Sequence, residues 1–188
     1  MKTALILVDI QNDYFKGGKM ELVGMDEAGT KAGTLLSYFR NNNLSTFHIQ
    51  HVASDPGLGF FLPNTDGVEL HDSIKPLPGE PIIQKHYPNG FRETILGEEL
   101  SKAGVGRVVV SGAMSHMCID ATTRAAADSG LECVLVHDTC ATRDLEFEGR
   151  TIAAREVHDS FMASLGWAYA KALTLDESVS ESHTDDML

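Results

Sequence analysis

Three side chains that could carry nucleophilic chemistry lie next to apolar runs. Asp9 follows "ALILV", Lys85 follows "PIIQ", and Cys118 stands between "RVVVSGA" and a helix-like run, "IDATTRAAAD". Each has an ordinary alternative, since acids and lysines at strand ends are often solvated and a lone cysteine is more often a core residue. Together, however, a helix N-terminus and an ammonium would favour the thiolate, and a carboxylate could take the thiol proton and return it to a leaving amine.

The surrounding elements would bring these three residues together. Apolar runs alternate with segments of helical spacing, which indicates a parallel sheet covered by helices on both faces. We therefore expect a three-layer α/β/α sandwich with a six-stranded, mainly parallel, Rossmann-like sheet. Ligands bind beyond the carboxyl ends of such strands. The expected strands cover 3–10, 44–52, 80–87, 105–113, 131–141 and 169–177, and the expected helices lie within 26–43, 89–104, 118–130 and 147–166.

The segment before the cysteine, "SGAMSHMC", has a second use. Backbone N–H groups in a tight turn that leads into a helix can form an oxyanion hole, although an ordinary strand-to-helix turn would have the same sequence pattern. His116 lies two residues before Cys118 and could contact a substrate or point into solvent. The other cysteines have simpler roles: Cys133 alternates on a strand as a core residue would, and Cys140 ends that strand.

Length and composition limit the organisation of the chain. Its 188 residues with 43% hydrophobic content suit one domain, which we place at 1–177, followed by an acidic tail at 178–188 that we expect to be disordered. The first run reads as a strand and not as an export signal, no run is long enough to span a membrane, and no C-x-x-C is present. We expect a cytoplasmic protein with free thiols.

The charge of the chain bears on its partners. The formal net charge is −12, and no cluster of Lys and Arg stands out. This argues against nucleic acid and anionic membranes as partners and leaves a small-molecule substrate. No phosphate loop or dinucleotide fingerprint is present, so no cofactor is expected.

Two histidines suggest a metal site at first sight. His48 and His51 are three residues apart on an expected strand, so their side chains should point to opposite faces. The other histidines form no H-x-x-x-H or D-x-H pair. We therefore expect no bound metal.

Three separated motifs resemble the isochorismatase-like cysteine hydrolases, a superfamily that includes nicotinamidases and N-carbamoylsarcosine amidase. The motifs are "LVDIQNDYFKGGKMELVG", "QKHYPNGF" and "VVVSGAMSHMCIDATTRAAADSG", and the resemblance runs from about residue 3 to residue 176. It implies a six-stranded parallel sheet between helices and a catalytic trio of Asp9, Lys85 and Cys118.

The resemblance also implies features that the residues alone do not indicate. A cis peptide is expected at Ala113–Met114, which would direct the N–H groups of Met114 and Cys118 toward a substrate oxygen. Walls of the substrate pocket would come from Phe15, Phe91, Met114 and His116.

Two departures from named members of the superfamily narrow the activity. The Asp-x-His element of metal-containing nicotinamidases is absent from "FHIQHVASDPG". True isochorismatases hydrolyse a vinyl ether without a cysteine nucleophile, whereas Cys118 stands at that position here. The segment "MSHMCIDATTRAA" looks closer to amidase-like members, and a streptothricin-type lactam hydrolase is one candidate.

We therefore predict a metal-independent cysteine hydrolase that cleaves the C–N bond of a small amide or lactam through a thioester. The alternatives are a vinyl-ether or ester hydrolase of the same fold, or a non-catalytic redox-responsive scaffold. The sequence does not name the substrate. We also expect a homo-oligomer, because the apolar segment "GFFLP" in the long loop 53–72 would be exposed on a monomer unless Phe60 or Phe61 closes the pocket.

Overall fold

The computed structural model describes residues 1–181, and residues 182–188 lie outside the described part. The last described element is helix α5, Leu175–Glu181, in which Ser178 is buried. The helix therefore continues past residue 177, where we expected the acidic tail to begin. The rest of the predicted tail falls outside the described residues.

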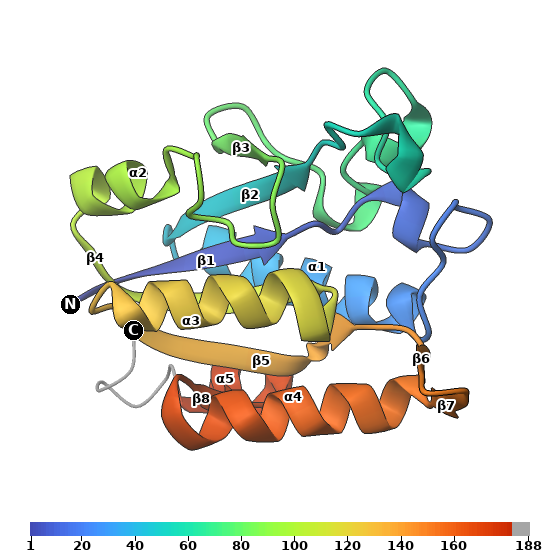
Figure 1. The fold of residues 1–188 in the computed structure, drawn as a ribbon. Helices are drawn as coiled ribbons and strands as arrows, with labels where there is room; N and C mark the ends of the chain where they lie inside the picture. The colour runs from blue at the N-terminus through green and yellow to red at the C-terminus, as the bar shows by residue number, and fades with distance from the viewer. Residues whose placement is uncertain (182–188) are drawn as a thin grey trace.

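The centre of the fold is a six-stranded sheet in the order β3-β2-β1-β4-β5-β8, and every pairing within it is parallel. This confirms the predicted sandwich, with helices on both sides of the strands (Figure 1). The strands are β1 Lys2–Val8, β2 Ser45–His51, β3 Ile82–Lys85, β4 Val105–Ala113, β5 Glu132–Ala141 and β8 Lys171–Leu173.

Alternate residues of β1 pack into two different apolar clusters, because successive side chains of a strand point to opposite faces. Leu5 and Leu7 join the cluster that contains the buried faces of α1 and α5, whereas Ile6 and Val8 join the cluster under the other helices. Both faces of the sheet are thus buried, which explains the continuous apolar run in the sequence. The helices are α1 Met25–Asn41, α2 Leu96–Ala103, α3 Asp120–Asp128 and α4 Ala154–Ala168.

One predicted helix begins later than expected. Residues 147–152, which we assigned to the start of the long helix, belong to a two-stranded antiparallel hairpin of β6 Leu145–Phe147 and β7 Arg150–Ile152. Glu148 and Gly149 both have positive φ, 49° and 77°, as a two-residue hairpin turn requires. Helix α4 starts only at Ala154, whose N–H donates to a carboxylate oxygen of Asp144 at 2.7 Å.

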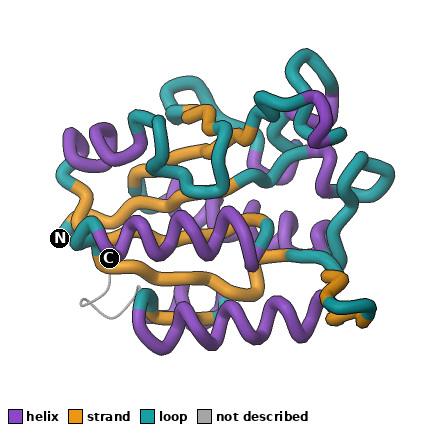
Figure 2. The backbone as a smooth tube through the Cα atoms, viewed as in Figure 1, coloured by secondary structure: helices purple, strands orange, loops and turns teal. Residues whose placement is uncertain are grey.

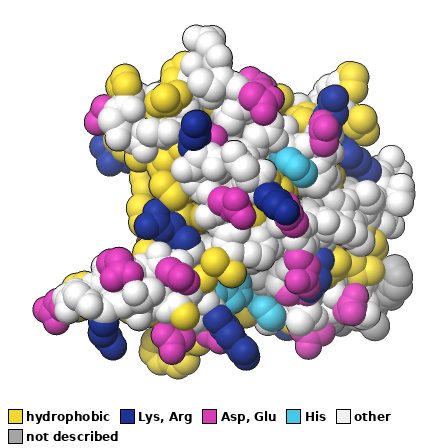
Figure 3. All heavy atoms as spheres, turned by 90° about the vertical axis from the view of Figure 1, so that its right-hand side faces the viewer, with side chains coloured by type: hydrophobic (Ala, Val, Ile, Leu, Met, Phe, Trp, Pro, Cys, Tyr) yellow, Lys and Arg dark blue, Asp and Glu magenta, His cyan; other side chains and the backbone are white. Residues whose placement is uncertain are grey.

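The loop after β1 and the long loop after β2 lie side by side at the carboxyl end of the sheet. The N–H of Asn12 donates to the carbonyl of Glu69, and Gln11 pairs with Leu70 in an isolated bridge. Figure 2 shows these loop segments gathered at the end of the sheet to which β1 and β2 point. Figure 3 views the same end, where acidic and basic side chains are interspersed on the surface.

The apolar segment of this loop is covered by its own chain. Phe61 is fully buried in the cluster beside α1, and Phe60 packs against that cluster with its ring 5.0 Å from the Phe61 ring. The exposed apolar loop from which we predicted a homo-oligomer is therefore not present. Oligomerisation stays a prediction without this support. Among residues 1–181, no helix is long and apolar enough to cross a membrane.

Candidate active site

Polar side chains meet where neighbouring strands of the sheet end. Asp9 directly follows β1, while His51 and Lys85 are the last residues of β2 and β3 and are register partners. Because β2 lies between β1 and β3, His51 stands between Asp9 and Lys85. Cys118 comes from the turn after β4, the neighbour of β1 on its other side. The structure thus brings together the three predicted residues and one more.

The ammonium of Lys85 is the centre of the cluster. Its Nζ lies 2.6 Å from Asp9 Oδ2, 3.0 Å from His51 Nδ1 and 3.3 Å from Cys118 Sγ. The carbonyl of Tyr87 accepts a further hydrogen bond at 3.1 Å. Four acceptors therefore share the three protons of one ammonium. The contact with sulfur is the longest of the four, as expected for the larger atom.

Two backbone features place Asp9 in the interior. Its φ of 53° turns the chain out of the strand, and its N–H donates to the Ile49 carbonyl at 3.1 Å. Opposite it, Gly112 on β4 has a φ of 133°, and a Cβ at this position would collide with the Val8 carbonyl. Only glycine allows the ends of β1 and β4 to approach this closely. The Asp9 side chain is consequently completely buried.

The buried charges shift one another. Burial and the Asp9 carboxylate raise the pKa of the Cys118 thiol well above its usual value, against the lowering effect of Lys85. Burial alone would lower the pKa of Lys85, but Asp9 and Cys118 outweigh it and raise that pKa. Lys85 therefore favours the thiolate, as we expected, whereas burial and the Asp9 carboxylate favour the neutral thiol.

The turn that carries the nucleophile is tightly wound. The Ala113–Met114 peptide is cis, and residues Ser115–Ile119 form a π-helical turn before α3. The Met114 carbonyl accepts hydrogen bonds from the N–H groups of Met117 and Ile119, at 3.0 and 3.2 Å. These hydrogen bonds fix the turn, and Cys118 within it is buried with 4% of its surface exposed.

Neighbouring elements anchor the same turn. The hydroxyl of Ser115 donates to the Ala141 carbonyl at 3.2 Å and lies 2.8 Å from His158 Nδ1 on α4. His116, which we expected to contact substrate, is half-buried with its Nδ1 2.6 Å from the Thr142 hydroxyl. The end of β5 therefore supports the nucleophile turn at two successive residues.

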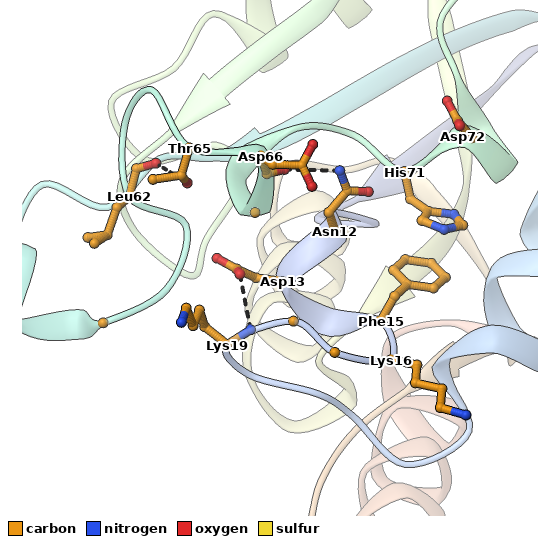
Figure 4. Close-up of a pocket in the computed structure, with 14 residues that line it drawn as sticks. Asn12, Asp13, Phe15, Lys16, Lys19, Leu62, Thr65, Asp66, His71 and Asp72 are labelled. Atoms are coloured by element: carbon orange, nitrogen blue, oxygen red, sulfur yellow. Dashed lines mark hydrogen bonds between the residues drawn. The ribbon is translucent and has the colours of Figure 1, made fainter.

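The two predicted aromatic wall residues lie in different surroundings. Phe15 is buried and stacks on His71, with ring centroids 3.5 Å apart, and the pair lines a cavity of about 660 Å³ between the loops after β1 and β2 (Figure 4). Phe91 is half-buried and packs against the cluster that contains Cys118. Asp9, Lys85 and Cys118 do not line this cavity.

Two residues close to the reacting atoms were not among the predicted site residues. Tyr14 is buried, and burial together with the nearby Cys118 and Asp9 raises the pKa of its phenol well above its usual value. His51 was considered only as a metal ligand. His51 lies at the end of an expected strand, and the same criterion that selected Asp9 and Lys85 would have identified it.

Several side chains near Cys118 carry atoms that could bind a metal ion. Within residues 1–181, the one group of three possible ligands is formed by Asp9, His51 and Cys118, with donor atoms within 4.8 Å of one another. The same three residues contact the Lys85 ammonium. A positive charge therefore already lies among them, and this donor set does not fit a metal ion.

Comparison with known proteins agrees with this architecture. The isochorismatase domain family matches residues 3–168. The isochorismatase family protein YddQ of Bacillus subtilis is 48% identical over 176 residues, which cover 94% of this chain and 98% of that protein. A streptothricin hydrolase of Streptomyces noursei is 33% identical over 177 residues, covering 93% of this chain and 60% of that protein.

Solved structures show the same relationship. A protein from Oleispira antarctica described as an isochorismatase hydrolase has a TM-score of 0.92 and 46% identity over 95% of this chain and 96% of that chain. N-carbamoylsarcosine amidase from Thermoplasma acidophilum, at 24% identity, shares the fold with a TM-score of 0.80 over 94% of this chain and 98% of that chain. The chain belongs to the isochorismatase family of hydrolases.

Proposed function

We propose that the protein is a cysteine amidohydrolase that cleaves a C–N bond in a small amide or lactam. The observation that carries this proposal is the buried group of Lys85, Asp9 and Cys118, in which the ammonium contacts both the carboxylate and the sulfur, at 2.6 and 3.3 Å. A base, a nucleophile and a positive charge that contacts both are buried together at the ends of the strands. These are the requirements of covalent acyl transfer.

The first half-reaction forms a thioester. Asp9 takes the thiol proton as the Cys118 sulfur attacks the carbonyl carbon, and the carbonyl oxygen becomes an oxyanion. The C–N bond then breaks, and the departing nitrogen takes the proton from Asp9 and leaves as ammonia or an amine. One carboxylate thus serves as base and then as acid.

The second half-reaction restores the enzyme. A water molecule gives a proton to Asp9 as its oxygen attacks the thioester carbon. The C–S bond breaks, the carboxylic product leaves, and the sulfur recovers its proton from Asp9. Atoms and protons balance over the cycle, so no co-reactant other than water is needed.

The N–H groups of Met114 and Cys118 are our candidates for the oxyanion hole. The turn that holds them is fixed by Ser115 and by the hydrogen bonds to the Met114 carbonyl. Preorganised donors of this kind lower the barrier because they do not have to reorient during the reaction, and removing one costs on the order of 3 kcal/mol.

Amide chemistry also occurs among the relatives. Besides the streptothricin hydrolase, a ureidoacrylate amidohydrolase of Acinetobacter baylyi is 28% identical over 156 residues. These names describe those proteins, and they favour an amide or lactam over a vinyl ether as the substrate class here. The absence of an Asp-x-His element and the position of Lys85 favour a reaction without metal.

A substrate screen tests the proposal. Wild-type protein and Cys118→Ala are incubated in parallel with small amides, lactams, esters and vinyl ethers, and release of ammonia or amine is scored. Amine release by wild type alone supports the amidohydrolase. Turnover of esters or vinyl ethers without any amide would assign the rival hydrolase, and equal rates for both proteins would exclude Cys118 as the nucleophile. Loss of activity to a chelator, with recovery on adding zinc, would contradict the metal-independent mechanism.

A further inference from the structure

His51 has a fixed place in the site. Its backbone is held on both sides by the buried side chain of Gln11, which accepts from the His51 N–H at 2.7 Å and donates to the His51 carbonyl at 2.9 Å. The same Gln11 amide also donates to the Val68 carbonyl at 2.7 Å. The imidazole therefore projects from a rigid point at the end of β2, with the Phe61 ring 5.8 Å away.

The contact with Lys85 determines the tautomer of His51. An ammonium can only donate, so His51 Nδ1, which lies 3.0 Å from Lys85 Nζ, must be an acceptor. The ring proton then resides on Nε2, on the far side of the imidazole. Burial lowers the pKa of His51 to about 4, against the raising effect of Asp9 and with a further lowering from Lys85, so the ring is neutral near pH 7.

Nε2 is a donor without a protein acceptor. No other residue in 1–181 forms a hydrogen bond with this nitrogen, whereas Nδ1 is occupied by Lys85. The His51 side chain is 12% exposed, and those of Asp9 and Lys85 are completely buried. Of these three side chains, only the imidazole reaches the solvent side of the site.

We propose that His51 is a substrate-binding residue whose Nε2–H donates a hydrogen bond to an acceptor atom of the substrate. The site would therefore prefer substrates with a carbonyl or carboxylate oxygen next to the reacting carbon over substrates without one. This proposal rests on the proposed function, because it assumes that the reaction takes place at Cys118.

The test measures alkylation of Cys118, which does not require the natural substrate. Iodoacetamide carries a carbonyl beside its reacting carbon, whereas allyl bromide carries no acceptor. Rates at Cys118 are measured by peptide mapping as a function of reagent concentration. The proteins compared are wild type, His51→Asn, which keeps an acceptor for Lys85 but has no atom at the position of Nε2, and His51→Gln, which can place an N–H donor there.

We expect His51→Asn to slow iodoacetamide by about threefold to tenfold, the size of one neutral hydrogen bond, while allyl bromide reacts at the wild-type rate. His51→Gln should recover part of the loss. Equal slowing of both reagents would mean that His51 acts only by orienting Lys85, and no slowing of either would mean that it has no role, so both results overturn the proposal. Failure of both reagents to label Cys118 in wild type would instead refute the proposed nucleophile, and the role of His51 with it.

Discussion

Asp9 and Lys85 form an ion pair of 2.6 Å in which neither side chain is exposed to solvent. Removing one partner of a buried pair leaves an uncompensated charge, which costs more than the pair itself contributes. When Cys118 passes its proton to Asp9, the negative charge moves from the carboxylate to the sulfur, and the same ammonium contacts both groups. The Asp9–Lys85 pair therefore contributes to the stability of the fold and also determines the net charge of the buried site.

Asp9→Asn should lower turnover by at least about 100-fold, because an amide cannot accept the thiol proton. The change leaves Lys85 buried without its partner, so we also expect a loss of about 3–5 kcal/mol in the free energy of unfolding. Turnover and urea denaturation are measured on the same samples. Asp128→Asn, which removes an exposed acid near the end of α3, is the matched control. Turnover of Asp9→Asn within tenfold of wild type would rule out Asp9 as the base.

Lys85→Met should move the pH dependence of Cys118 alkylation to higher pH. The ammonium lowers the pKa of the thiol, whereas burial and Asp9 raise it, so its loss leaves only the raising effects. The measurement is the iodoacetamide rate at Cys118 between pH 6 and pH 10. Lys102→Met, on the surface of α2, controls for the loss of a lysine. Identical profiles for wild type and Lys85→Met would mean that Lys85 does not act on the thiol.

Sub-stoichiometric iodoacetamide should modify Cys118 before the other two cysteines, although all three thiols are buried. Burial raises the pKa of Cys133 to about 11 and that of Cys140 to about 12. The pKa of Cys118 is also raised, so resting acidity alone does not favour it. Its advantage is the adjacent carboxylate, which can take the proton during the attack. Preferential labelling of Cys133 in a peptide map would show that acidity alone governs reactivity.

The strand ends were the part of the site that the sequence could predict. Continuous apolar runs marked strands buried on both faces, and the polar residues that ended two of them were Asp9 and Lys85. His51 ends a strand in the same way. It was missed because its spacing from His48 was examined only for a shared metal, and the two rings do diverge: His48 Nε2 lies 3.0 Å from Glu80 Oε2 on the other side of the strand.

Local backbone geometry was harder to predict. The hairpin at 145–152 depends on positive φ at Glu148 and Gly149, which the helical spacing of the following residues obscured. The π-helical turn at Cys118 contains Ser115, which hydrogen-bonds to the end of β5, a tertiary contact that the local sequence pattern does not indicate. The spacing of apolar residues indicates which face of a helix or strand is buried, but it does not indicate the residue at which that element begins or ends.

Acidification should destabilise the protein through His51. Its pKa is about 4 in the folded state, against an ordinary value near 6.5, so between these pH values the unfolded chain binds a proton that the folded chain does not. The free energy of unfolding therefore falls as the pH drops through this window, by about 3 kcal/mol for this residue. His51→Asn lacks the titration. We therefore expect the free energy of unfolding of wild type, measured by urea denaturation, to fall by about 3 kcal/mol relative to that of His51→Asn between pH 7 and pH 4. The same pH dependence in both proteins would contradict this prediction.

Gly112→Ala should damage the site through the backbone alone. The new Cβ would collide with the Val8 carbonyl, and a φ of 133° is strained for any residue with a side chain. Strain and overpacking together should cost about 3 kcal/mol or more in the free energy of unfolding. Relief requires the ends of β1 and β4 to separate, which draws Asp9 away from the turn of Cys118. The alkylation rate of Cys118 should therefore fall even under conditions in which the variant is folded by circular dichroism.

Gly97→Ala is the matched control for this substitution. Gly97 lies in helix α2, where an added Cβ would make an ordinary contact of 3.6 Å with the Phe91 ring. Alanine is favoured over glycine inside a helix by about 0.5–1 kcal/mol, so this variant should be as stable as wild type or more stable. If Gly112→Ala matched it in stability and in alkylation rate, the close approach of β1 and β4 would not be what holds Asp9 against the nucleophile.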